Sequence, residues 1–129
     1  MIGILIVSHG AFGESLIHSA SHVLGKRPVY LRQLGVTVHD DPDDILPVAE
    51  DLIRFLDQGA GVLVLADMYG ATPANIACRL LRPGRVEGLA GVNLRMLIRA
   101  ITYREEPLLT MRDKALEGAA EGVMRMGDC

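Results

Sequence analysis

Residues 2–10 read IGILIVSHG and give the clearest indication of the fold. Its apolar part, rich in β-branched side chains, predicts a strand that is buried on both faces, as strands of parallel sheets are. Beyond Gly10 the apolar residues change to a helical spacing, and Gly25 predicts the end of that helix. The apolar positions of the predicted helix are Phe12, Leu16, Ala20, Val23 and Leu24. A buried strand followed directly by an amphipathic helix is the first half of a βαβ unit.

The same alternation of strand and helix continues along the chain. Further strands are predicted at Val29–Leu34, Gly61–Ala66 and Val86–Val92. Helices are predicted from Pro42 to about Leu56, from Ala74 to Leu81, after Asn93, and in the remainder to about Met126. Alternating elements of this kind imply right-handed crossovers and a mostly parallel sheet. We therefore expect an α/β fold, a three-layer sandwich with a central sheet of four or five strands and helices on both faces.

Polar residues that can cap a helix stand at the predicted helix starts. Asp41 and Thr72 each precede a proline, so each is predicted as an N-cap with proline in the first turn. Asn93 is predicted to cap the next helix. Thr110 and Asp113 form a candidate capping box in the last one.

The composition limits the classes of protein to which this chain can belong. Its 129 residues are the length of one domain, so we expect a single domain over residues 1–129. A net charge of −3 argues against a general nucleic-acid-binding protein, and two cysteines are too few for a disulfide framework or a cysteine-rich zinc site. The apolar runs are too short for membrane insertion, and we expect a soluble cytoplasmic protein.

Reactive side chains follow two of the predicted strands, because His9 ends the first and Asp67 comes directly after the third. If these strands are neighbours, both side chains lie at the sheet edge where open parallel sheets bind ligands. A carboxylate that accepts a hydrogen bond from one imidazole nitrogen leaves the other nitrogen free as a nucleophile. Helix N-termini and the Thr72 hydroxyl offer donors to an anion, a combination that suits a phosphorylated histidine. The spacing alone equally allows a structural interpretation, in which His9 completes a turn and Asp67 caps a helix.

Three stretches of the sequence resemble one known family, and they stand in the order that the family has. They are residues 4–10 with the helix that follows, residues 61–75, which read GVLVLADMYGATPAN, and residues 90–97, which read AGVNLRML. The family is the IIA component of the mannose/fructose/sorbose class of the bacterial phosphoenolpyruvate-dependent sugar phosphotransferase system (PTS). The resemblance covers nearly the whole chain and implies one EIIA domain of the mannose class.

The resemblance implies a role for each matching residue of the candidate site. His9 matches the histidine that is phosphorylated, Asp67 matches the carboxylate that orients it, and Thr72 matches the hydroxyl that contacts the phosphoryl group. The other phosphoryl-binding positions are Gly10, Gly70 and Ala71. Many members have a second glycine where this chain has alanine, which changes how closely the backbone approaches there. The implied activity is that of a phosphotransferase, a histidine phosphocarrier with no metal and no cofactor.

The resemblance also implies partners. The carrier protein HPr would phosphorylate His9, which would pass the phosphoryl group to a separate IIB component or to a regulatory acceptor. A homodimer is implied as well. An apolar run in the final third of the chain is longer than one helix face needs and indicates where the dimer forms: Leu94, Met96, Leu97, Ile98 and Ile101.

Four other functions compete with a sugar phosphocarrier. A regulatory PTS relay that transports no sugar would have the same site, and the phosphodonor subunit of dihydroxyacetone kinase shares the fold but is normally longer. A histidine phosphatase would have arginine at the position of Ser8 and a second catalytic histidine. A flavodoxin-like nucleotide-binding module would carry no phosphohistidine.

Other candidate residues are interpreted as structural. Glu14, His18 and His22 lie one turn apart on a predicted helix, a spacing that metal ligands use, but a polar helix face gives the same pattern. His39 precedes a helix cap and is expected to face solvent. Cys78 is expected to be a small core residue rather than a nucleophile.

Overall fold

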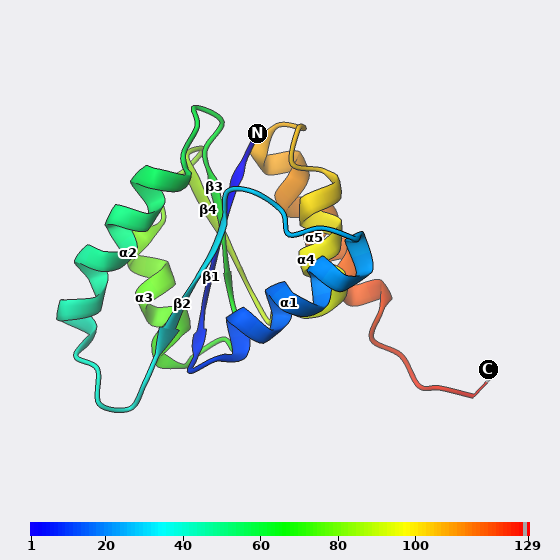
Figure 1. The fold of residues 1–129 in the computed structure, drawn as a ribbon, viewed down its shortest axis with the longest axis horizontal. Helices are drawn as coiled ribbons and strands as arrows, with labels where there is room; N and C mark the ends of the chain where they lie inside the picture. Colours follow the sequence, from blue (N-terminus) through cyan, green and yellow to red (C-terminus); the bar gives the residue numbers. More distant parts are fainter. Residues whose placement is uncertain (128) are drawn as a thin grey trace.

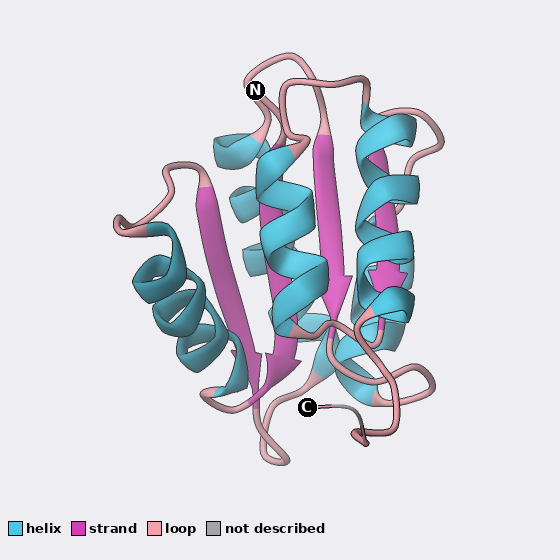
Figure 2. Cartoon of the chain, turned by 90° about the vertical axis from the view of Figure 1, so that its right-hand side faces the viewer, coloured by secondary structure: helices cyan, strands magenta, loops and turns pink. Residues whose placement is uncertain are grey.

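A parallel sheet forms the centre of the molecule, which a computed structural model describes over residues 1–127 and 129. The strands of this part of the chain are β1 (Gly3–His9), β2 (Leu31–Val36), β3 (Val62–Ala66) and β4 (Val86–Ala90). Their order across the sheet is β2-β1-β3-β4, and every neighbouring pair is parallel (Figure 2). The prediction of a mostly parallel sheet is confirmed, and β1 and β3 are neighbours.

Helices cover both faces of the sheet. The helices of the described residues are α1 (Phe12–Leu24), α2 (Pro42–Leu56), α3 (Thr72–Leu80), α4 (Leu94–Thr102) and α5 (Leu108–Glu121). Figure 1 shows α2 and α3 on one side of the sheet and α1, α4 and α5 on the other, which confirms the three-layer sandwich. None of these helices is long and apolar enough to cross a membrane.

β1 lies between β2 and β3 and is buried on both faces, as its apolar sequence predicts. Ile4 and Ile6 belong to the apolar cluster under α1, α4 and α5, whereas Leu5 and Val7 belong to the cluster under α2 and α3. All four side chains are fully buried. Because two independent layers hold β1, the position of His9 at its end is well determined by the core.

β2 begins two residues later than the sequence predicts. Tyr30 has a positive φ of 50°, which interrupts the extended conformation before Leu31. The guanidinium of the buried Arg104 donates hydrogen bonds to the carbonyl oxygens of Val29 and Tyr30, at 2.7 and 3.0 Å. The start of β2 is therefore set by a side chain more than seventy positions further along the chain, and β2 ends at Val36.

Two of the predicted helix caps are confirmed. The Asp41 side chain accepts a hydrogen bond from the amide of Asp43 at 2.9 Å, at the start of α2. The Asn93 side chain accepts one from the amide of Met96 at 2.8 Å, at the start of α4. Both contacts satisfy amides that have no partner within the helix.

The predicted cap at Thr72 is wrong. α3 begins at Thr72 itself, and Ala71 is its extended N-cap residue. The carbonyl of Ala71 accepts the first helical hydrogen bond, from the amide of Asn75 at 3.0 Å. Because proline is also tolerated in the second helical position, the Thr-Pro pair allows the helix to start one residue earlier.

The capping box in the last helix is wrong as well. α5 begins at Leu108, so Thr110 and Asp113 lie inside the helix. Pro107 precedes the helix with ψ at 148°, and its fixed ring makes it a natural boundary. α5 ends at Glu121, five residues before the predicted end at Met126.

Asp57 anchors the turn between α2 and β3. Its carboxylate accepts hydrogen bonds from the amides of Gly59 and Gly61, at 2.9 and 3.1 Å, and pairs with the guanidinium of Arg85. Burial alone would raise the pKa of the Asp57 carboxyl, but these hydrogen bonds and the charge of Arg85 hold it below the ordinary value of 3.8.

Asp57→Asn is expected to lower the free energy of unfolding by about 1 kcal/mol at pH 7. A carboxyl whose pKa is lowered by folding stabilises the fold above its unfolded-state pKa and loses that contribution as the pH falls through the folded-state value. The difference in the free energy of unfolding between wild type and Asp57→Asn should therefore be constant above about pH 5 and shrink as the pH falls below 3.8. Urea denaturation at a series of pH values checks this, and a difference that grows on acidification would contradict it.

Candidate functional site

His9 and Asp67 meet at the carboxyl ends of β1 and β3, at the bottom edge of the sheet in Figure 1. The Asp67 Oδ2 atom lies 2.7 Å from the His9 Nδ1 atom, and it also accepts a hydrogen bond from the His9 backbone amide at 2.9 Å. The His9 side chain is 52% exposed, whereas the Asp67 side chain is only 12% exposed. The structure therefore brings together the two residues that the sequence singles out.

The register of the sheet explains why the two residues meet. Val7 of β1 lies opposite Ala66 of β3, so the residues that follow them leave the sheet side by side. Asp67 does not cap α3, because the N-cap residue of that helix is Ala71. Its second oxygen, Oδ1, instead accepts a hydrogen bond from the amide of Met68 at 2.9 Å. Both carboxylate oxygens therefore accept hydrogen bonds, Oδ2 from His9 and Oδ1 from the loop that follows Asp67.

Hydrogen bonding keeps Asp67 ionised. Burial would raise the pKa of the Asp67 carboxyl, but hydrogen bonds from the His9 amide and ring and from the amide of Met68 together lower it. An ionised carboxylate can only accept hydrogen bonds, so the carboxylate beside Nδ1 keeps the ring hydrogen on that nitrogen. The Nε2 atom of His9 is therefore the ring nitrogen that remains free for chemistry.

The other predicted phosphoryl-binding residues lie in the two loops that start at this edge. Gly10 follows His9 with a φ of 51°, and its amide donates to the carbonyl of Val36 at 2.9 Å. Gly70 has a φ of 85° in the loop after Asp67, and Ala71 and Thr72 then start α3. α1 and α3 thus both begin in the loops that follow β1 and β3, and helix N-termini favour anions.

Ser8 is a polar residue of this site that the sequence reasoning missed. Its side chain is fully buried, and its Oγ atom accepts a hydrogen bond from the amide of Gly13 at 2.9 Å. The one available signal was a hydroxyl placed in an otherwise apolar strand.

Gly35 supports the same turn from β2. A Cβ atom at this position would lie 2.2 Å from the carbonyl oxygen of Gly10, which is closer than packing allows. The backbone of β2 therefore approaches the turn after His9 so closely that the position requires glycine.

The residues with metal-like spacing on α1 are Glu14, His18 and His22. Glu14 pairs with Arg27 at 3.0 Å, and the described residues contain no group of three metal-ligating side chains. Cys78 is exposed on α3, so its interpretation as a core residue is wrong. His39 is exposed in the loop before α2, as expected.

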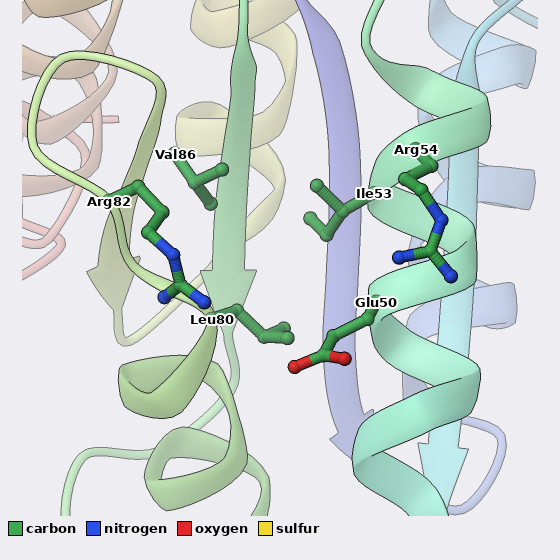
Figure 3. Close-up of a pocket in the computed structure, with 6 residues that line it drawn as sticks. All are labelled: Glu50, Ile53, Arg54, Leu80, Arg82 and Val86. Atoms are coloured by element: carbon green, nitrogen blue, oxygen red, sulfur yellow. The ribbon is translucent and has the colours of Figure 1, made fainter.

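A separate cavity of about 220 Å³ lies at the opposite edge of the sheet, between α2 and the connection from α3 to β4 (Figure 3). The residues that line it are Glu50, Ile53, Arg54, Leu80, Arg82 and Val86. Val86 is the first residue of β4, whereas His9 is the last residue of β1. This cavity is therefore not part of the site around His9.

Comparison with known proteins identifies relatives. A family model described as "EIIA-man: PTS system fructose IIA component" matches residues 3–115. The chain is 28% identical over 106 residues to the PTS system mannose-specific EIIAB component of Escherichia coli (strain K12), across 81% of this chain and 32% of that protein. It is 34% identical over 68 residues to the transcriptional regulatory protein LevR of Bacillus subtilis (strain 168), across 52% of this chain and 7% of that protein. The chain thus spans a third or less of the length of these relatives.

The fold also matches a solved structure over its full length. The phosphotransferase system component EIIA from Streptococcus agalactiae superposes with a TM-score of 0.88 at 26% sequence identity, and the match covers 100% of both chains. The α/β fold and the order of its elements are therefore shared with a crystal structure of that component.

Proposed function

The chain belongs to the EIIA-man family of PTS fructose IIA components, and we propose that it is a phosphohistidine carrier. His9 accepts a phosphoryl group from the phosphorylated form of HPr and passes it to an acceptor of the IIB class. The observation that carries the proposal is the 2.7 Å contact between the His9 Nδ1 atom and the Asp67 carboxylate. It holds the ring in one orientation and leaves Nε2 exposed to a partner.

The transfer needs no proton to enter or leave the site. The Nε2 lone pair of neutral His9 attacks the phosphorus of the donor phosphohistidine, the phosphorus–nitrogen bond of the donor breaks, and its electron pair returns to the donor imidazole. The His9 ring keeps its Nδ1 hydrogen and gains positive charge, which the Asp67 carboxylate balances. The three phosphoryl oxygens then accept hydrogen bonds from donors in the loops that contain Gly10, Gly70, Ala71 and Thr72.

The exchange is nearly reversible because one phosphorus–nitrogen bond replaces another. In-line geometry and neutralisation of the phosphoryl charge are what the protein has to supply. We therefore propose a transfer without metal or cofactor, carried out in the cytoplasm by one EIIA domain over residues 1–129.

An apolar surface next to His9 supports contact with a protein partner. Phe12, Met68 and Tyr69 are 44%, 57% and 83% exposed, and each lies within three residues of His9 or Asp67. Exposed aromatic and methionine side chains are enriched at protein interfaces. A phosphorylated partner protein would cover them as its phosphohistidine reaches Nε2.

The test is phosphorylation by the complete relay. The protein is incubated with phosphoenolpyruvate, enzyme I and HPr, and its intact mass is measured under alkaline conditions. We expect one phosphoryl group per chain, which is stable in base and lost in acid. We expect no increase in mass when HPr is omitted. A chain that stays unmodified beside a phosphorylated HPr would contradict the proposed function.

A regulatory role is the second candidate, because the chain also matches LevR, which is a transcriptional regulatory protein. In that role the same phosphorylation of His9 would report metabolic status, and no sugar would be transported. The acceptor distinguishes the two functions. Chase of the phosphorylated protein with purified IIB components should discharge it if it serves transport and should leave it phosphorylated if it serves regulation only.

We also propose that the protein is a homodimer, as membership of the family implies. The apolar run on α4 does not by itself require a partner, because Met96 and Leu97 lie in the core of this chain and Leu94, Ile98 and Ile101 pack against that core. Light scattering at micromolar concentration should give about twice the chain mass of 13.9 kDa. A monomer at every concentration tested would contradict the dimer.

A further inference from the structure

Ser8 connects the strand that carries His9 to the helix that follows it. The Ser8 side chain is fully buried at the end of β1, directly before His9. Its Oγ atom lies 2.9 Å from the backbone nitrogen of Gly13, which is the second residue of α1. The hydroxyl oxygen is the acceptor in this hydrogen bond, because an amide can only donate.

This hydrogen bond replaces the missing cap of α1. The N-cap residue of the helix is Ala11, which has no side-chain oxygen and makes no capping hydrogen bond. An uncapped helix start leaves amides without partners, and its first turn frays more easily. Ser8 satisfies the amide of Gly13 from outside the helix, so β1 holds the first turn of α1 in place.

The packing around this contact leaves room for little else. A Cβ atom on Gly13 would lie 2.9 Å from the Ser8 Oγ atom and 3.0 Å from the Cβ atom of Gln33. The start of α1 therefore rests directly on the hydroxyl and on β2. Loss of the hydroxyl oxygen would remove the hydrogen bond and also the packing contact that sets the distance between the start of α1 and β1.

The first amides of α1 belong to this same turn. The amide of Gly10 donates to the carbonyl of Val36, and that of Gly13 donates to Ser8. Within the described residues, the amides of Ala11 and Phe12 have no hydrogen-bond acceptor, and both residues are exposed. Free amides at a helix N-terminus stabilise an anion only when they are held in a fixed position.

We propose that Ser8 is a positioning residue for phosphoryl transfer, which rests on the proposed function of His9. By capping α1 at Gly13, Ser8 fixes the amides of Ala11 and Phe12 relative to His9, so that they stabilise the charge on the transferred phosphoryl group. Ser8 itself touches neither the donor nor the phosphoryl oxygens. Its effect falls on the rate of transfer at saturating donor and not on the affinity for phosphorylated HPr.

The experiment measures the rate at which phosphorylated HPr transfers its phosphoryl group to each variant in a single turnover, as a function of HPr concentration. Removal of one aligned donor costs about 10²–10³ in rate in other transfers. Because Ser8→Ala leaves the amides present and only less well positioned, it is expected to reduce the maximal rate by less, about 10- to 100-fold, with the half-saturating concentration unchanged. Ser8→Thr keeps the hydroxyl oxygen and should retain a rate within about threefold of wild type. The matched control is Ser21→Ala in the same helix, because the Ser21 hydroxyl donates to the carbonyl of Ile17 at 2.7 Å, away from the site.

Two outcomes would overturn the proposal. A wild-type maximal rate in folded Ser8→Ala, with a lower melting temperature as its one change, would make Ser8 a purely structural residue. If Ser8→Ala does not fold, Ser8→Cys keeps the shape of the side chain with a slightly larger and poorer acceptor, and a wild-type rate in Ser8→Cys would overturn the proposal in its place. Failure of the proposed function is recognised separately, because wild type itself would then remain unphosphorylated.

Discussion

His9→Gln is expected to receive no phosphoryl group from HPr, with a rate below about one part in 10⁴ of wild type, as the loss of a nucleophile causes in other enzymes. The reason is that the imidazole Nε2 atom is the nucleophile in the proposed transfer, and a glutamine amide has no equivalent lone pair on nitrogen. The fold should tolerate this change, because the His9 side chain is 52% exposed. The measurement is labelling by the phosphoenolpyruvate relay, followed by intact mass spectrometry.

The matched control for His9→Gln is His18→Gln. His18 is an exposed histidine of α1. Its substitution replaces the same residue type as His9→Gln but leaves the site unchanged. It should be labelled at the rate of wild type. Labelling that persists in His9→Gln and disappears in His18→Gln would show that His18 on α1 is the phosphoryl acceptor, and it would contradict the proposed site.

Asp67→Asn is expected to slow transfer by about 10²–10⁴, the range in which a proton-holding partner contributes. The carboxylate accepts hydrogen bonds from both the ring and the amide of His9, and it balances the charge that the ring gains on phosphorylation. Asparagine is similar in size but neutral, and it can turn its amide hydrogens toward Nδ1, which would favour the wrong tautomer. Rapid-quench measurement of transfer from HPr gives the rate.

Asp57→Asn is the matched control for Asp67→Asn. Asp57 is also partly buried, also accepts hydrogen bonds from two amides, and lies in the turn before β3 rather than after it. Its variant should transfer at the rate of wild type despite its lower stability. A rate for Asp67→Asn within twofold of wild type would mean that the carboxylate has no part in the transfer.

The alternation of strands and helices could be predicted from the sequence because each element has a strong local signal. The apolar run of β1 and the cap of α2 at Asp41 are examples, since both depend on residues close together in the chain. The start of β2 could not be predicted, because it depends on hydrogen bonds from Arg104, which is distant in the sequence. Contacts of this kind carry no periodic signal.

The candidate site was predictable as a set of residues but not as a geometry. His9 and Asp67 meet because β1 and β3 are neighbours, and the sequence does not specify the order of strands. A threonine before a proline predicts an N-cap at Thr72, whereas the helix begins one residue earlier. Ser8 was missed because its function depends on an amide of the next element, Gly13, which only the folded chain brings to it.

In the proposed transfer, His9 carries the phosphoryl group on Nε2 while the Asp67 carboxylate accepts the hydrogen bond from Nδ1. Long-range proton–nitrogen NMR correlation of the ¹⁵N-labelled protein, phosphorylated through HPr, tests it most directly, because the two ring nitrogens give different patterns of coupling to the ring protons and to phosphorus. We predict phosphorus coupling at Nε2 of His9 and a protonated Nδ1. Phosphorus coupling at Nδ1 of His9, or at a ring nitrogen of His18, His22 or His39, would contradict the account.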